Sequence, residues 1–376
     1  MKKIRVGVVG LGHRGRAILT LAAEFEAVEI AAACDIRPHN WYEQQWLSPA
    51  PLADMFPRAE FYEDYDEMLD AAGLDAVIVE TGADIHAEFC AKALEKNVNV
   101  LTDIPVVASL AEAELLWKAS QKTDAMISTG ANPNYRKYTI LLREFYEKGL
   151  LGKPYCMEAE YIHWSLPGSE MSVHLNENGD WRKLLIPIRY CTHSLGPLLN
   201  ILDEELRLVN CFGTGKQAPD STKDDMMCAQ FQTDSGVVVR LMRNGRCRAE
   251  IGQHNYRVFG TEGYMEMQNR FDKPVIRYNS MKELDTSLKE ISGENMPPAY
   301  AGNPIASGPN GHGGMDYAML DEFFKAILEN KPAPIPLKAG LAMTIPGIYA
   351  EESAKRGGEV LRMRYPWDED WTTEIR

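Results

Sequence analysis

A glycine-rich turn near the N-terminus constrains the fold of this chain more than any other feature. The apolar run 4–9 leads into Gly10-Leu11-Gly12-His13-Arg14-Gly15, and an amphipathic stretch follows. Glycines at this spacing permit a tight turn from strand to helix, and the N–H groups at the helix N-terminus can then approach a pyrophosphate. The sequence therefore predicts a dinucleotide-binding α/β domain, with cofactor contacts from Gly10, Gly12, His13, Arg14 and Gly15.

An acidic residue after the second apolar run indicates which dinucleotide binds. The run 28–34 ends at Asp35, 20 residues beyond Gly15, where a carboxylate accepts hydrogen bonds from the adenosine ribose. Its negative charge repels the 2′-phosphate of NADP, so NAD is favoured as the cofactor. Arg37 leaves NADP as an alternative, because a guanidinium can pair with a phosphate or stack on adenine. A turn without a ligand, in which Asp35 is only a cap, is the structural alternative.

The spacing of the apolar segments divides the chain into two domains. Up to about residue 127, short apolar runs alternate with amphipathic stretches, which is typical of parallel strands joined by helices. After about residue 150, longer strand-like segments follow one another directly, which favours an antiparallel sheet. We expect an α/β Rossmann domain with a doubly wound parallel sheet over residues 1–127. An α+β domain with a large, mostly antiparallel open sheet is expected over residues 128–376, with a long loop at 295–314.

Charge and cysteine spacing exclude several classes of partner. The chain has 40 Lys and Arg residues against 54 Asp and Glu residues, a net charge of −14, so we expect neither nucleic-acid nor membrane binding. The cysteines form no C-x-x-C pair, so we expect free thiols, a reducing compartment and no metal site. No run approaches the ~18 apolar residues of a membrane span. These features predict a cytoplasmic, soluble protein.

Several further motifs indicate a family. Thr81-Gly82 and His86 follow the third apolar strand, Asp103-Ile104-Pro105 follows the fourth, and glycine-rich motifs lie at 149–154 and 259–263. Together with the N-terminal turn, these motifs resemble the Gfo/Idh/MocA oxidoreductase family over nearly the whole chain. The resemblance implies a nicotinamide cofactor in the first domain, a sugar, cyclitol or similar polyol against the sheet of the second, and a homodimer or homotetramer. It also implies cofactor contacts from Thr81, Gly82, His86, Asp103, Ile104, Pro105 and Asn132.

One position departs from the family pattern. The family's usual tripeptide after the fourth strand is Glu-Lys-Pro, whose lysine lies near the nicotinamide and helps to handle the proton of the substrate hydroxyl. This chain reads Asp103-Ile104-Pro105, and Ile104 has no titratable group with which to exchange a proton. Pro105 can still shape the turn beside the nicotinamide. The proton chemistry is therefore carried by other residues or lost.

A second set of motifs combines histidine with aromatic residues. The set comprises Tyr161-Ile162-His163-Trp164, Trp181-Arg182 and the segments 190–197 and 312–316. It resembles one branch of the superfamily, which includes NAD-dependent glycosidases. Those enzymes oxidise a sugar hydroxyl transiently, eliminate the aglycone, add water and reduce the ketone again. The branch has an acidic residue where this chain reads Gly130-Ala131-Asn132-Pro133, which is a second departure.

Side chains in these motifs are the expected catalytic groups. His193 lies in an expected helix and is the expected general base, because imidazole accepts a proton near neutral pH. Tyr190, one helical turn earlier, is expected to share the proton or to hold the sugar. A buried structural histidine and a core tyrosine are the alternatives. Glu80 and Asp84 are expected to be solvated or to cap a helix, and the expected substrate contacts are His163, Tyr161, Arg182, Trp181 and His312.

Three functions are compatible with these features. The leading prediction is an NAD-dependent oxidoreductase that acts on a secondary hydroxyl of a sugar or glycoside. The second is a glycoside hydrolase or lyase that keeps its NAD and works through a transient keto-sugar, without the two carboxylates that ordinary glycosidases need. The third is a non-catalytic protein that binds NAD or a sugar. Net release of NADH distinguishes the first function from the second.

Overall fold

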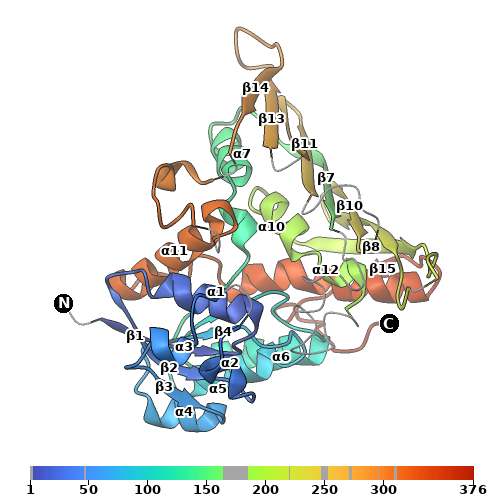
Figure 1. The fold of residues 1–376 in the computed structure, drawn as a ribbon. Helices are drawn as coiled ribbons and strands as arrows, with labels where there is room; N and C mark the ends of the chain where they lie inside the picture. Colours follow the sequence, from blue (N-terminus) through green and yellow to red (C-terminus); the bar gives the residue numbers. More distant parts are fainter. Residues whose placement is uncertain are drawn as a thin grey trace. The chain divides into compact units, whose positions relative to one another are not determined.

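The computed structural model describes residues 3–45, 48–163, 185–219, 221–246, 253–270, 273–294, 296–308 and 311–376. Figure 1 labels its helices and strands along the chain. The described residues form two compact units. The first contains the residues up to Ala131 together with Gly302–Leu341, and the second contains those from Asn132 to Ala301 together with Ala342–Arg376. Each unit has its own sheet.

A six-stranded parallel sheet forms the centre of the first unit. Its strand order is β3-β2-β1-β4-β5-β6, and every neighbouring pair is parallel. β1 and β4 are buried along almost their whole length, as expected for strands with helices over both faces of the sheet. The predicted doubly wound sheet is confirmed, although the short strand β3 was not predicted. The strands are β1 (Ile4–Val9), β2 (Val28–Cys34), β3 (Glu60–Tyr62), β4 (Ala76–Val79), β5 (Asn99–Thr102) and β6 (Ile127–Thr129).

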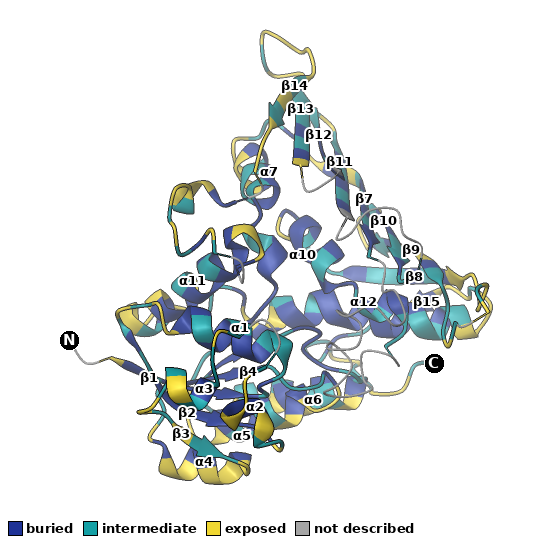
Figure 2. Ribbon diagram, in the orientation of Figure 1, coloured by how far each residue is buried: buried dark blue, intermediate teal, exposed yellow. Residues whose placement is uncertain are grey.

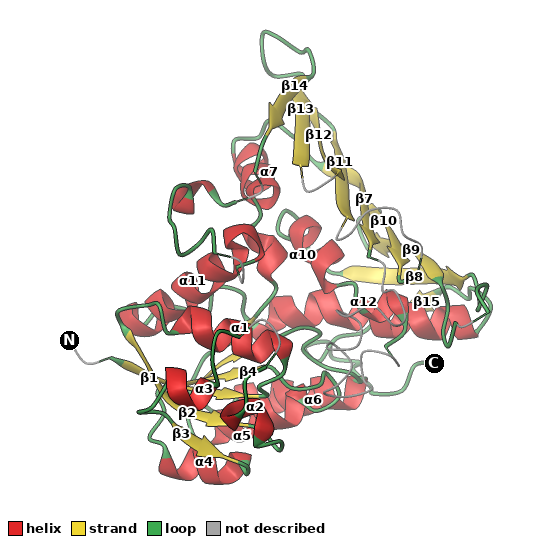
Figure 3. Ribbon diagram, viewed as in Figure 1, coloured by secondary structure: helices red, strands yellow, loops and turns green. Residues whose placement is uncertain are grey.

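Local capping signals start two helices of the first unit. Asp64 accepts a hydrogen bond from the N–H of Glu67 at the start of α4, and Ser109 accepts one from that of Glu112 at the start of α6. In contrast, α1 begins after Gly12, which offers no side chain as a cap. The α-helices of this unit are drawn in red in Figure 3 and comprise α1 (His13–Ala22), α2 (His39–Tyr42), α3 (Leu52–Met55), α4 (Tyr65–Ala71), α5 (His86–Glu95), α6 (Leu110–Ser120) and α11 (Met315–Glu329).

A nine-stranded open sheet is the main element of the second unit. Its order is β14-β13-β12-β11-β7-β10-β9-β8-β15, and among the described strands only β7 and β10 pair in parallel. Buried Met157, Ala159 and Tyr161 alternate along β7 with more exposed residues, so one face of the sheet packs against the core (Figure 2). The predicted mostly antiparallel sheet is confirmed. Its strands are β7 (Pro154–Ile162), β8 (Leu206–Gly213), β9 (Met226–Thr233), β10 (Val238–Asn244), β11 (Gln253–Gly260), β12 (Gly263–Arg270), β13 (Lys273–Ser280), β14 (Lys289–Ser292) and β15 (Leu361–Arg362).

Helices pack within the second unit as well. The described α-helices are α7 (Lys137–Glu147), α10 (Thr192–Leu199) and α12 (Leu337–Lys355), whose first residues belong to the first unit. Short 3-10 helices are η1 (Asn132–Tyr135), η2 (Pro187–Arg189) and η3 (Pro298–Tyr300) in this unit, and η4 (His312–Gly314) in the first. Within the described ranges, no helix combines the length and the apolar character needed to cross a membrane.

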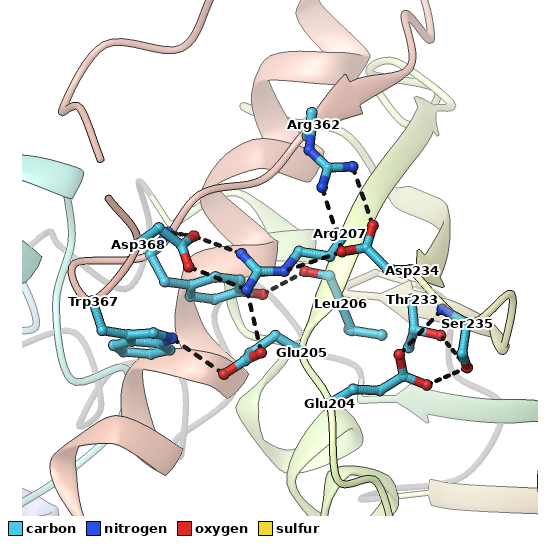
Figure 4. A network of polar contacts seen from close by, with 11 residues as sticks. Glu204, Glu205, Leu206, Arg207, Thr233, Asp234, Ser235, Arg362, Trp367 and Asp368 are labelled. Carbon is cyan, nitrogen blue, oxygen red and sulfur yellow. Dashed lines mark hydrogen bonds and ion pairs between the residues drawn. The ribbon is translucent and has the colours of Figure 1, made fainter. Parts of the chain in front are cut away.

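A salt-bridge network centred on Arg207 fastens the C-terminal segment to β8 (Figure 4). The guanidinium donates to both carboxylate oxygens of Asp368, with Nη1–Oδ2 at 2.5 Å and Nη2–Oδ1 at 3.1 Å. Nη2 also donates to Glu205, and the Tyr365 hydroxyl donates to the carbonyl of Leu206 over 2.8 Å. Arg207 and Asp368 are both mostly buried, so their bidentate salt bridge is stronger than an exposed one. Asp368 therefore holds the edge at which β15 pairs with β8.

Replacement of Asp368 tests this network. Asp368→Asn keeps the shape of the side chain but removes its charge, so the free energy of unfolding should fall by about 1–3 kcal/mol. Asp370→Asn is the matched control, because Asp370 pairs with Arg364 at the surface with its side chain 68% exposed. That variant should lose about 0–1 kcal/mol. Denaturant unfolding of both variants measures the difference, and equal losses would contradict the prediction.

Candidate functional site

A cavity of about 440 Å³ lies in the first unit, beside the carboxyl ends of β1, β2 and β4. Its walls are the glycine-rich turn, which follows β1, and the segments that follow β2 and β4. Most of the predicted cofactor residues line its wall, namely Gly10, Gly12, His13, Arg14, Asp35, Arg37, Thr81, Gly82 and Asp103.

Two glycines allow the turn to approach the neighbouring strand. Gly10 has a φ of +87°, and a Cβ at this position would lie 2.7 Å from backbone atoms of Glu80. A Cβ on Gly15 would overlap the carbonyl oxygen of Gly10. Only glycine fits at either position, so β1, α1 and the segment after β4 close into a cradle. The cradle fits a dinucleotide whose pyrophosphate lies at the N-terminus of α1.

Asp35 connects the glycine-rich turn to the end of β2. Its Oδ2 accepts a hydrogen bond from the N–H of Leu11 at 2.6 Å, and its Oδ1 accepts one from that of Arg37 at 2.8 Å. A carboxylate has about four acceptor positions, so the group can accept further bonds from ribose hydroxyls in the cavity that it lines. This position fits the predicted role of Asp35 toward the adenosine half of NAD.

The other predicted cofactor residues do not line the cavity; they are Gly15, His86, Ile104, Pro105 and Asn132. His86 is buried and bridges two loops, with Nδ1 3.0 Å from the carbonyl oxygen of Pro105 and Nε2 2.9 Å from that of Thr81. Ile104 is only 2% exposed and is joined to Pro105 by a cis peptide bond. Asn132 is buried and belongs to the second unit.

An ion pair between buried Asp316 and partly exposed Arg14 joins α1 to α11 in the first unit. Arg14 donates from Nη1 to Oδ2 of Asp316 at 2.5 Å and from Nη2 to Oδ1 at 2.9 Å. Nδ1 of His312 lies 2.6 Å from the same Oδ2. The predicted substrate residue His312 thus holds Asp316 through one ring nitrogen, while its side chain remains 59% exposed. Asp316 was not predicted as a site residue. It lies in the first turn of α11, and the left-handed backbone of Gly313 and Gly314 separates it from His312 in η4.

The structure corrects the prediction for Glu80, which was expected to be solvated or to cap a helix. Its side chain is 2% exposed, and its Oε2 lies 3.8 Å from Nε of Arg14. The residue directly follows β4, which is buried throughout, and this position carries the carboxyl group into the wall of the cavity. Among the described residues, none makes a hydrogen bond to this Oε2.

Burial and neighbouring charges move the pKa values of the two acids in opposite directions. For Asp316, burial raises the pKa, but the charges of Arg14 and His312 lower it by more, so it lies well below its ordinary value. For Glu80, burial and the charge of Asp103 raise the pKa well above its ordinary value, against the opposing effect of Arg14. Asp316 is therefore a stable carboxylate, whereas Glu80 holds its proton unusually strongly.

Several predicted substrate and catalytic residues gather in the second unit. Tyr161 stacks on His254 with ring centroids 3.9 Å apart, and the guanidinium of Arg243 lies 4.2 Å from the centroid of Tyr161. The ring centroids of Tyr161 and His163 are 5.4 Å apart. Two further predicted residues, Trp181 and Arg182, lie outside the described residues. We term the group the histidine cluster, and its members are Tyr161, His163, Tyr190, His193, Arg243, His254 and Tyr256.

The predicted catalytic pair lies within the histidine cluster. Oη of Tyr190 is 3.3 Å from Nε2 of His193. The sequence placed both on one helix, but α10 begins only at Thr192, and Tyr190 follows the 3-10 helix η2. The two side chains therefore meet across the junction between η2 and α10, and not along one turn of a single helix. The hydroxyl of Tyr256 donates to the carbonyl oxygen of His193 at 2.7 Å and so connects α10 to β11.

Sequence reasoning missed His254 and Tyr256 as members of the site. They alternate along β11 and share one face of the sheet, with Oη of Tyr256 3.4 Å from Nδ1 of His254. Burial lowers the pKa of His254 well below its ordinary value, and the charges of Arg136, His193 and Arg243 lower it further. His254 is therefore neutral near pH 7. The spacing of two between these polar ring residues was the available signal in the sequence.

Two family models match this chain. The first describes an oxidoreductase family with an NAD-binding Rossmann fold and matches residues 4–131. The second describes the GFO/IDH/MocA C-terminal domain and matches residues 139–266. The first match covers the whole parallel sheet, and the second covers the centre of the antiparallel sheet.

Similar proteins cover nearly the whole chain. A glycosyl hydrolase family 109 protein of Shewanella pealeana is 22% identical over 384 residues, which is 94% of this chain and 83% of that protein. An alpha-N-acetylgalactosaminidase of Shewanella oneidensis is 22% identical over 388 residues, again 94% of this chain and 83% of that protein. The structure of levoglucosan dehydrogenase with NADH and L-sorbose has a TM-score of 0.76 at 16% identity, over 97% of this chain and 100% of that one. The last similarity shows a shared fold.

Replacement of Asp35 tests the assignment of the cavity. Asp35→Ala removes the acceptor for the ribose, so the Kd for NAD should rise by about 10- to 100-fold, and the preference for NAD over NADP should decrease. Glu63→Gln is the control, because it removes one negative charge from the same cavity wall at an exposed position. Calorimetric titration with both cofactors measures the two affinities. An unchanged Kd for NAD in Asp35→Ala would refute the assignment.

Proposed function

The chain belongs to the GFO/IDH/MocA oxidoreductase family, and on this premise we propose that it transfers a hydride from a secondary hydroxyl of a sugar or glycoside to NAD. The cavity of the first unit lies within the NAD-binding match and contains the cradle that a pyrophosphate requires. A levoglucosan dehydrogenase that binds NADH and a sugar shares the fold. These observations support a small polyhydroxylated carbohydrate as the substrate.

One observation carries the proposal, the hydrogen bond between Tyr190 and His193. When NAD is bound, it supplies the hydride acceptor. Oxidation of an alcohol also requires that its hydroxyl lose a proton, and an imidazole accepts that proton near neutral pH. We assign His193 as the general base, while Tyr190 shares the proton or orients the sugar. The bond from Tyr256 to the His193 carbonyl holds the base in place.

The position of Ile104 supports the same assignment. It stands where the resemblance places the family lysine, and its buried apolar side chain cannot exchange a proton. Proton transfer then requires other groups. The Tyr190–His193 pair supplies a hydroxyl that can donate a proton and an imidazole that can accept one. The proposed substrate contacts are His163, Tyr161, Arg182, Trp181 and His312.

A redox-neutral glycosidase is the second candidate. Curated relatives that cover 94% of the chain are named as a glycosyl hydrolase family 109 protein and as an alpha-N-acetylgalactosaminidase. In this candidate, a transient ketone acidifies the neighbouring C–H, the aglycone leaves by elimination, water adds, and the hydride returns to the sugar. A protein that binds NAD and sugar without turnover is the third candidate.

Three finer properties belong to the proposal. The charge of Asp35 supports NAD over NADP. We propose that the outer face of the nine-stranded sheet, where Glu158 pairs with Arg240 and Arg257 at 2.8 Å each, joins copies of the chain into a homodimer or homotetramer. A cytoplasmic location is supported by the free thiols of the described cysteines, which are Cys34, Cys90, Cys156, Cys191, Cys211 and Cys228.

A substrate screen distinguishes the three candidates. Purified protein is incubated with NAD and a set of mono- and disaccharides and aryl glycosides, and both NADH absorbance and free reducing sugar are followed. A dehydrogenase produces NADH in step with the oxidised product. A redox-neutral glycosidase releases sugar without net NADH. If the protein binds NAD but gives neither signal, the non-catalytic candidate is favoured.

Replacement of His193 tests the assigned base. His193→Asn keeps a polar side chain but cannot accept a proton, so kcat should fall by about 10²- to 10⁴-fold. The Kd for NAD and the melting temperature should stay near those of the wild type. His39→Asn, at an exposed histidine of the first unit, is the control for the chemical change. Wild-type turnover in His193→Asn would exclude it as the base, and a lower melting temperature without selective loss of kcat would indicate a structural role.

A further inference from the structure

The strand order determines which acids lie beside the nicotinamide half of the cofactor. The order β2-β1-β4-β5 places Asp35 on one side of the glycine-rich turn and Glu80 and Asp103 on the other. A dinucleotide crosses such a sheet where the strand order reverses, which is between β1 and β4. With the adenosine half at Asp35, the nicotinamide half extends toward the ends of β4 and β5. Glu80 and Asp103 are therefore the acids on the nicotinamide side.

Glu80 is a buried carboxyl group without full charge compensation. Its side chain is 2% exposed, and its Oε2 has no hydrogen-bond partner among the described residues. Nε of Arg14 lies 3.8 Å away, but both Nη groups of Arg14 donate to Asp316. One guanidinium therefore serves two acids, and the charge of Asp103 acts on Glu80 as well. The cavity wall has an excess of acidic groups at this point.

The charge of the nicotinamide ring depends on its oxidation state. Hydride transfer moves one hydrogen and two electrons from the carbinol carbon to the ring, which cancels the positive charge of the ring. The hydroxyl proton of the substrate leaves to the base. An ionised carboxylate near the oxidised ring is stabilised by the positive charge and loses that stabilisation when the ring is reduced.

We propose that Glu80 takes up a proton from solvent when the bound cofactor is NADH and releases it when the bound cofactor is NAD⁺. The inference rests on the proposed function, because it requires the cavity to bind NAD. An ionised Glu80 favours the oxidised cofactor, so bound NADH becomes a stronger hydride donor as the pH rises.

The charged groups around Glu80 set the direction of the effect. Arg14 on α1 lowers the pKa of Glu80, whereas burial, Asp103 after β5 and Asp316 on α11 raise it. His312 of η4 influences these charged groups through its contact with Asp316. The net effect is a pKa well above the ordinary value for a glutamic acid.

The ratio of the Kd for NADH to the Kd for NAD⁺, measured from about pH 6 to about pH 9, tests the proposal. In the wild type, the ratio should rise by about tenfold as Glu80 ionises. Titrations in buffers of different ionisation enthalpy should show that NADH binding takes up more protons than NAD⁺ binding, by up to about one per site. In Glu80→Gln, both the rise and the proton difference should disappear.

Two further variants keep the test decisive. Asp84→Asn removes an exposed carboxylate from the loop after Glu80 and should retain the wild-type pH dependence. Asp103→Asn should move the rise to lower pH, because one negative charge near Glu80 is removed. A flat ratio in the wild type, or an unchanged rise in Glu80→Gln or Asp103→Asn, would overturn the proposal while leaving NAD binding intact. A wild type that binds neither cofactor would overturn the proposed function and this inference with it.

Discussion

The absence of a Cβ at Gly10 and Gly15 is the constraint on which the first unit depends. A Cβ on Gly10 would lie 2.7 Å from the backbone of Glu80, and one on Gly15 would overlap the carbonyl of Gly10. The end of β1 can therefore approach the end of β4 only with glycine at position 10, and α1 can close on the turn only with glycine at position 15. This approach forms the cradle, brings the Glu80 carboxyl into the cavity wall and leaves Arg14 in the first turn of α1.

The charges around Arg14 follow from that approach. Its guanidinium is bound by Asp316 through two hydrogen bonds, and Glu80 is left with a more distant contact. Burial makes an unpaired charge costly, so the pKa of Asp316, which has two strong partners, lies below its ordinary value, and the pKa of Glu80 lies above it. The pairing of Arg14 with Asp316 thus distinguishes a structural carboxylate from Glu80, whose carboxyl group has no such partner.

The second unit builds its site on a different principle. A neutral, buried His254 stacks on Tyr161, and the hydroxyl of Tyr256 fixes the carbonyl of His193. Side chains on adjacent strands of a stiff sheet hold the first turn of α10, so the ring of His193 meets Tyr190 without a helical turn between them. Such contacts would preorganise His193 for its proposed role as general base, which no lysine can take at Ile104.

The sequence by itself determined the local features of this protein. The run of apolar residues before the glycine-rich turn predicted β1 and α1, because a strand-to-helix turn of this kind depends on a few neighbouring residues. The acid after β2, and the change from alternating helices and strands to consecutive strands, were readable for the same reason. Tertiary structure alone decided which charged side chains pair and which are buried. Arg14 and Asp316 are 302 residues apart, and Glu80 is buried only because β1 approaches β4. Charge pairing and desolvation depend on neighbours in space, and no local pattern in a single sequence records them.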